Sequence, residues 1–143
     1  MSSFNVFDIS GAGMSAESVR LDTEASNLAN ADSVSGDPTQ VYQAKHPVFQ
    51  AVQSRGALTG QGTADQASAS VKVLSIASNT AAPESRYDPS NPLANSDGYV
   101  YAPNVNVVEE MADMISASRA YQNNVEVMNT ARNLMLDTLK LGQ

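Results

Sequence analysis

The sequence predicts an α+β fold, in which long N- and C-terminal helices pack side by side as a coiled-coil-like axial core, joined by a small β-rich middle domain. At both ends of the 143-residue chain, apolar residues recur at alternating spacings of three and four, as in laterally packed helices. The middle lacks this period, and Pro, Gly and Ser punctuate its short β-branched runs. The predicted organisation is an N-terminal axial helix at residues 1–31, a middle domain at 32–103 and a C-terminal axial helix at 104–143.

The predicted N-terminal helix carries one apolar stripe, which we name the N-terminal seam. The helix is expected at roughly residues 4–29: Ser2 or Ser3 can cap it, and the turn-forming segment Asn30-Ala31-Asp32 should end it. Gly11 and Gly13 each cost roughly 1 kcal/mol relative to alanine in a helix interior. Their small size favours the close approach of another helix. The N-terminal seam consists of Phe4, Phe7, Gly11, Met14, Ser18, Leu21, Ala25 and Leu28.

The middle domain is expected to form a small twisted sheet. Pro47 should lie at an edge or a bulge, because proline cannot donate to a strand ladder. Residues 54–70 are rich in Gly, Ala, Ser, Thr and Gln and are interpreted as a mobile loop. The prolines of residues 83–98 predict a second loop. The expected strands lie at residues 41–52, 71–76 and 99–101.

The predicted C-terminal helix runs from Val107 to Leu141, about 50 Å at 1.5 Å per residue. Asn106 and Glu109 resemble a capping box at its start. Its C-terminal seam consists of Met111, Met114, Ser118, Tyr121, Val125, Met128, Arg132, Met135 and Leu139. A second stripe recurs at Val127, Ala131, Leu134, Thr138 and Leu141. A helix that is apolar on two flanks cannot bury both against one partner helix, so further neighbours are expected.

Composition and charge exclude several classes of function. The net charge of −7 is spread along the chain without a basic patch, which disfavours nucleic acids and anionic membrane surfaces as partners. There is no cysteine, hence no disulfide or thiolate chemistry. No apolar run is long enough to span a bilayer, and the first residues lack the basic and apolar regions of a cleaved signal peptide.

No catalytic constellation is evident in the sequence. His46 is the single histidine, too few for a typical zinc site, and no Gly-x-Ser-x-Gly turn accompanies it. Gly11-Ala12-Gly13 lies inside a helical pattern rather than after a strand, which argues against a phosphate loop. We therefore expect no enzyme activity, no cofactor and no metal. The periodicity leaves two alternatives to assembly open: a self-contained helical hairpin, and a cytoplasmic adaptor or chaperone that binds a client helix.

A short motif resembles a known family. The segment Ala25-Ser26-Asn27-Leu28-Ala29-Asn30 is similar to the signature that closes the N-terminal helix of flagellar axial proteins, the rod, hook and hook-associated subunits. The short chain favours proximal-rod subunits, since distal-rod and hook subunits would have a much longer middle. Further similar blocks lie at residues 7–11, 98–100, 103–111, 116–122, 124–130 and 139–143.

This resemblance implies a structural subunit of the proximal rod of the flagellar basal body, part of the motor's drive shaft, that polymerises through its terminal helices. It implies export through the flagellar type III apparatus into the periplasm, in agreement with the missing signal peptide. The implied partners are copies of the chain, other rod proteins, the rod-base adaptor, the surrounding rings and, transiently, the export apparatus. No nucleic acid and no direct membrane insertion are expected.

Overall fold

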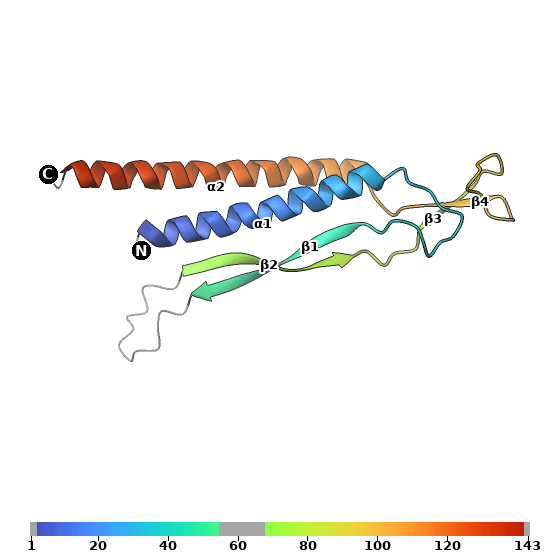
Figure 1. Ribbon diagram of the computed structural model, residues 1–143, viewed down its shortest axis with the longest axis horizontal. Coiled ribbons are helices and arrows are strands. Elements are labelled where there is room, and N and C mark those ends of the chain that lie inside the picture. Colours follow the sequence, from blue (N-terminus) through green and yellow to red (C-terminus); the bar gives the residue numbers. More distant parts are fainter. Residues whose placement is uncertain (1–2, 55–67, 142–143) are drawn as a thin grey trace.

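The structure is a computed structural model that describes residues 3–54 and 68–141. It confirms the α+β fold, because two long helices lie side by side and a small set of antiparallel strands connects them. Figure 1 shows both helices along the long axis, with one strand pair beside α1 and the other at the end where α2 begins. The elements are α1 (Ser3–Asn30), β1 (Lys45–Ser54), β2 (Ser68–Ser78), β3 (Glu84–Tyr87), β4 (Tyr99–Ala102) and α2 (Val107–Leu141).

The strands form two separate two-stranded sheets rather than the single small sheet that was expected. β1 and β2 pair from Lys45↔Ser78 to Ser54↔Ser68. Their register shifts between Val48 and Phe49, next to Pro47, so the proline does lie beside a bulge. Most of the expected mobile loop, residues 55–67, falls outside the described residues. The rest of that range, residue 54 and residues 68–70, belongs to the strands.

The second sheet corrects the prediction of a loop at residues 83–98. β3 lies within that range and pairs antiparallel with β4, from Glu84↔Ala102 to Tyr87↔Tyr99. The rings of Tyr87 and Tyr99 pack edge to face, with centroids 5.2 Å apart. A bridge between Ser35 and Tyr101 ties the segment after α1 to the same sheet. Contacts distant in sequence therefore stabilise a strand that is only four residues long.

Helix α2 begins, and helix α1 ends, where the sequence indicates. Asn106 caps α2, because its Oδ1 accepts hydrogen bonds from the backbone N–H groups of Val108 at 3.1 Å and Glu109 at 3.4 Å. Asn30 closes α1, and its side-chain amide donates to the carbonyl of Ser26 at 2.8 Å. Within residues 3–54 and 68–141, neither helix has a stretch apolar enough to cross a membrane.

The buried core is small. Its apolar members are Ala16, Ala44, Val100 and Ala117. In the described part of the chain, no Leu, Ile, Met or Phe side chain is fully buried. The chain therefore leaves most of its large apolar side chains at least partly open to solvent.

Candidate assembly surface

Helix α1 has three sides, of which two contact the rest of the chain. One side packs on α2, where a Cβ added to Gly13 would lie 2.8 Å from Asn124 Nδ2. A second side packs on the β1–β2 hairpin, where Ala16 and Val19 line a shallow hollow together with Val73. Successive helical residues are about 100° apart, so the N-terminal seam lies on the third side.

The N-terminal seam is the open side of α1. A Cβ added to Gly11 would meet nothing within 4 Å, which contrasts with Gly13. Ser18 and Ala25 are exposed, and the Phe4 side chain lies outside the described residues. The other seam members are half-buried: Phe7, Gly11, Met14, Leu21 and Leu28. The face that packs on α2 is instead small and polar, and includes Ser10, Gly13, Glu24 and Asn27.

The two predicted stripes of α2 are also divided between contact and solvent. Met114, Ser118, Val125, Met128 and Met135 are half-buried, whereas Met111, Tyr121, Arg132 and Leu139 are exposed. In the second stripe, Val127, Leu134 and Thr138 are exposed and Ala131 is half-buried; the Leu141 side chain lies outside the described residues. Four exposed apolar residues of the described part of α2 belong to neither stripe: Val107, Val108, Ile115 and Leu136. For Val108 and Ile115, the spacing of three and four from Met111 is the signal that could have found them.

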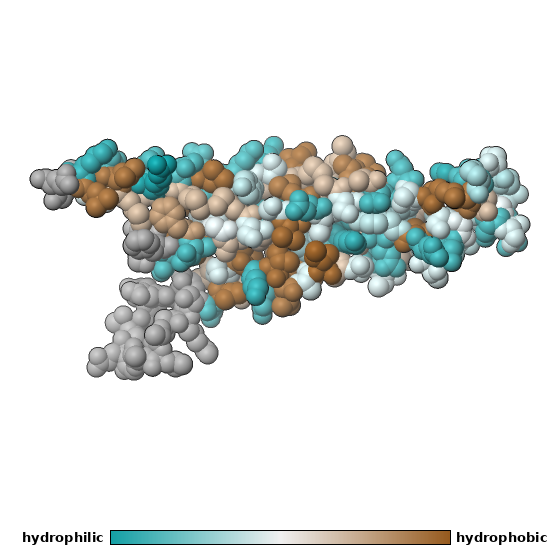
Figure 2. Space-filling view, in the orientation of Figure 1, coloured by the Kyte–Doolittle hydropathy of each residue, from teal (hydrophilic) through white to brown (hydrophobic). Residues whose placement is uncertain are grey.

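The open sides of the helices meet at a shallow groove of about 450 Å³. The groove is lined by Leu21, Met114, Ile115, Ser118, Arg119 and Gln122. It thus joins one member of the N-terminal seam to two members of the C-terminal seam. Figure 2 shows that apolar side chains also gather elsewhere on the molecular surface, in patches over the helices and the hairpin.

A buried amide fixes the position of these surfaces. Asn27, in the family-like motif, is fully buried and uses its whole hydrogen-bonding capacity. Its Nδ2 donates to the Lys45 carbonyl at 2.8 Å and to Glu110 Oε2 at 3.0 Å. Its Oδ1 accepts from the Lys45 N–H at 2.8 Å and from the Tyr42 hydroxyl at 2.9 Å. Asn27 therefore connects α1, α2 and the start of β1.

The other residues of the motif fall into two groups, polar residues that bond within the chain and apolar residues that are at least partly exposed. Ser26 shares a hydrogen bond with the Tyr42 hydroxyl at 3.0 Å, and Asn30 closes the helix. Leu28 is half-buried, whereas Ala25 and Ala29 are exposed. The polar residues of the motif thus act within the chain and two of its apolar residues face outward.

An ionic cluster lies one turn from Asn27. The Nε of Arg20 donates to Glu24 Oε1 at 2.7 Å, and its Nη2 donates to Asp113 Oδ1 at 3.0 Å. Burial is the main cause that raises the pKa of the Glu24 carboxyl, and the bond to Arg20 opposes it. Asp113 and Glu110 raise the same pKa further, because like charges disfavour ionisation.

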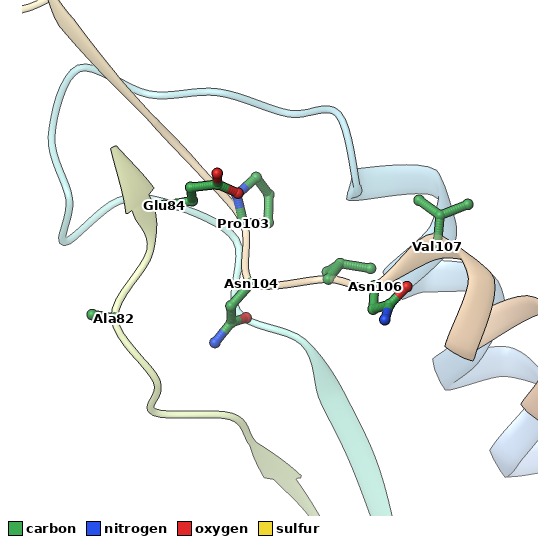
Figure 3. Close-up of a pocket in the computed structure, with 7 residues that line it drawn as sticks. Ala82, Glu84, Pro103, Asn104, Asn106 and Val107 are labelled. Carbon is green, nitrogen blue, oxygen red and sulfur yellow. The ribbon is translucent and has the colours of Figure 1, made fainter. Parts of the chain in front are cut away.

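A hollow at the start of α2 has a structural role. Figure 3 shows it where the chain passes from β4 into α2, lined among others by Glu84, Asn104 and Asn106. Asn104 donates to the Ala81 carbonyl at 3.1 Å and accepts from the Ala44 N–H at 3.3 Å, so its side chain holds two loop segments together.

His46 is exposed on β1. Within residues 3–54 and 68–141, no group of three or more His, Asp or Glu side chains could hold a metal ion.

Two family models match the two ends of the chain. The model described as flagella basal body rod protein matches residues 7–36, which include the motif and the junction around Asn27. The model described as flagellar basal body rod FlgEFG protein C-terminal matches residues 96–141, from before β4 through α2. The helices and their junction are thus those of flagellar rod proteins as a class.

Curated relatives narrow this class. The flagellar basal-body rod protein FlgC of Salmonella typhimurium is 49% identical over 143 residues, and that of Yersinia enterocolitica is 50% identical, each over 100% of both chains. FlgC of Buchnera aphidicola subsp. Schizaphis graminum is 41% identical over 145 residues, again over 100% of both chains. The chain belongs to the FlgC family of flagellar basal-body rod proteins. It is a structural subunit of the basal body that associates with other rod components, and not an enzyme.

Proposed function

We propose that this rod subunit polymerises through the sides of α1 and α2 that its own fold leaves open. One observation carries the proposal: nine large apolar residues of α2 are exposed, while no Leu, Ile, Met or Phe of the described residues is fully buried. A surface helix of a soluble monomer normally keeps its solvent-facing side polar, so this many exposed apolar side chains favour their burial against other chains. The most exposed are Val108 at 76%, Leu139 at 69%, Leu134 at 62%, Ile115 at 56% and Met111 at 52%.

The arrangement of these residues favours several neighbours. Ile115 and Val127 are twelve positions apart, which places them about 120° apart around the helix axis. One partner helix cannot cover both flanks. Covering a Leu, Ile or Met side chain completely contributes about 1.5–3 kcal/mol to the free energy of association. A neighbour that covers only one or two of these side chains therefore binds weakly. Stability then depends on many weak contacts, which suits a cooperative polymer.

The hairpin supplies a second kind of contact surface. Val71, Lys72 and Val73 of β2 line the hollow against α1, whereas Leu74, at the register shift, does not. Leu74 is 62% exposed, and the described strands β1 and β2 contain lysine but no Asp or Glu. Both helices carry a net negative charge. We infer that the outward face of the hairpin contacts the acidic helices of a neighbouring rod subunit. Unlike surfaces that meet in this way form open helical filaments when the rotation between subunits does not close a ring, as a rod requires.

Family membership supports the finer assignments. We propose that the neighbours are copies of this chain and other rod proteins. The rod-base adaptor and the surrounding rings are proposed as further partners. We also propose a position in the proximal rod, in the periplasm, which the subunit reaches through the flagellar type III apparatus without cleavage. The relatives are named basal-body rod proteins, which is the basis of these assignments.

Substitution of exposed side chains tests the proposal. Ile115→Asp and Leu134→Asp place a charge on open surfaces, so each variant should fold as the wild type does. Each should fail to enter basal bodies purified from a strain that lacks the wild-type gene. Thr80→Asp, at an exposed polar position in the loop between β2 and β3, is the control and should be incorporated. Normal incorporation of both apolar-to-Asp variants would exclude these flanks as contact surfaces.

Cell fractionation tests the proposed export and compartment. An intact chain of unchanged N-terminal mass in the basal-body fraction supports uncleaved export. A processed N-terminus, or a pool confined to the cytoplasm, would contradict it.

A further inference from the structure

Four carboxylates gather around one guanidinium at the contact between α1 and α2. Arg20 contacts three of them: it is bonded to Glu24 and Asp113, and its Nη1 lies 3.9 Å from Glu17 Oε2. The fourth, Glu110, accepts a hydrogen bond from Asn27 instead. With all four ionised, the cluster has more negative than positive charge.

The charged groups of the hairpin do not offset this excess. Lys45 of β1 holds its Nζ over the Tyr42 ring, 5.6 Å from the ring centroid. His46 of β1 and Lys72 of β2 are exposed. In the part of the chain that the structure describes, the groups that act on the Glu24 carboxyl are Arg20 on its own helix and Asp113 and Glu110 on α2.

Glu24 has the least favourable environment of the four carboxylates. Its Oε2 accepts no hydrogen bond from any described residue, as is also true of Glu17 Oε2, but the Glu24 side chain is 4% exposed and that of Glu17 is 20% exposed. A proton on this oxygen would remove one negative charge from the buried cluster. It would also convert an acceptor without a donor into a hydroxyl that can donate toward neighbouring carboxylates.

We propose that Glu24 is a proton-binding site that controls the strength of the α1–α2 contact, so that the helix pair tightens as the pH falls from neutral to mildly acidic. The raised pKa of Glu24 gives the sign, because the folded chain then binds the proton more tightly than the unfolded chain does. The free energy of unfolding rises as the pH falls from the raised folded pKa toward the ordinary value of 4.5.

Thermal unfolding of the full-length chain, followed by circular dichroism at a concentration that prevents polymerisation, tests the proposal. The wild-type midpoint should rise as the pH is lowered from 7 to 4.5. Glu24→Gln keeps an oxygen that can accept a hydrogen bond from Arg20, but its side chain cannot ionise. The unfolding midpoint of this variant at pH 7 should therefore exceed that of the wild type, and it should not rise as the pH is lowered. Glu126→Gln, at an exposed position of α2, is the matched control and should keep the wild-type response.

A wild-type midpoint that is flat or falls over this interval, or a Glu24→Gln variant with the wild-type response, overturns the proposal. A second measurement serves if Glu24→Gln does not fold. The carboxyl carbon of Glu24 in the wild-type chain, followed by NMR, should titrate above 4.5, and titration at or below this value overturns the proposal equally. Neither measurement requires assembly, so the outcome is independent of the polymerisation proposal.

Discussion

Asn27 donates a hydrogen bond to Glu110 at 3.0 Å across the α1–α2 contact, between residues 83 positions apart in the sequence. Both side chains are buried, with Asn27 at 0% and Glu110 at 4% exposure. Asn27 also bonds the backbone of Lys45, so one amide sets the relative position of α1, α2 and the hairpin. A polar contact thus defines the relation of two helices whose apolar residues remain partly open.

Asn27→Leu should destabilise the isolated chain strongly. The substitution leaves the Glu110 carboxylate and the Lys45 N–H without their partner, inside a buried site. Loss of a partner for buried groups of this kind costs about 2–4 kcal/mol. Urea unfolding measures the change, and Asn123→Leu, at an exposed position of α2, should change the free energy of unfolding by less than about 0.5 kcal/mol. Equal effects of the two variants would contradict the role of Asn27.

The sequence predicts the helices well because their signals are local. The three-and-four spacing defines both helices, and Asn106 marks the start of α2 as its capping pattern indicates. β3 was not predicted, since its stability comes from pairing with β4 and from the contact of Tyr87 with Tyr99. A four-residue segment between prolines has no local period that could reveal such pairing.

The candidate surface was predictable only in part. The apolar period locates the N-terminal seam, but it does not indicate that α2 and the hairpin cover the other two sides of α1. The motif singles out Asn27, whereas its partners Glu110 and Tyr42 are known only once the chain has folded. Glycine residues show the same limit: both Gly11 and Gly13 predict close helix packing, and only Gly13 makes it within the chain.

Gly13→Ala and Gly11→Ala should have opposite effects on the isolated chain. The new Cβ at Gly13 would lie 2.8 Å from Asn124 Nδ2, so the Asn124 side chain or the helix must move and the chain should lose stability. The new Cβ at Gly11 meets open space, and alanine in a helix interior is favoured over glycine by roughly 1 kcal/mol. Chemical denaturation of both variants measures the difference.

Incorporation into basal bodies gives a second result for the same pair. If a neighbouring subunit approaches the open side of α1 closely, Gly11→Ala should be incorporated poorly although it is the more stable chain. Normal incorporation of Gly11→Ala would indicate that no close helix contact forms over Gly11.

Gly98→Ala should destabilise the sheet formed by β3 and β4. Gly98 has a φ of 80°, which side chains with a Cβ rarely adopt, and its added Cβ would lie 2.9 Å from Tyr87 Cε2. The strain should lower the free energy of unfolding by about 1–2 kcal/mol. Hydrogen exchange should show faster exchange at β3 and β4, while α1 keeps its protection. Ser96→Ala, at an exposed position of the same turn, should behave as the wild type.

Leu28→Asp and Met128→Asp should abolish incorporation and also weaken the helix pair. Both residues are half-buried, so a charge there is partly desolvated in the isolated chain and more so if a neighbour covers it. Leu134→Asp differs, because Leu134 is 62% exposed and its substitution should affect assembly alone. The comparison requires two readouts for each variant, the thermal unfolding midpoint of the isolated chain and its amount in purified basal bodies. Variants of Leu28 and Met128 that are incorporated normally would disprove the part of the assembly proposal that concerns the two seams.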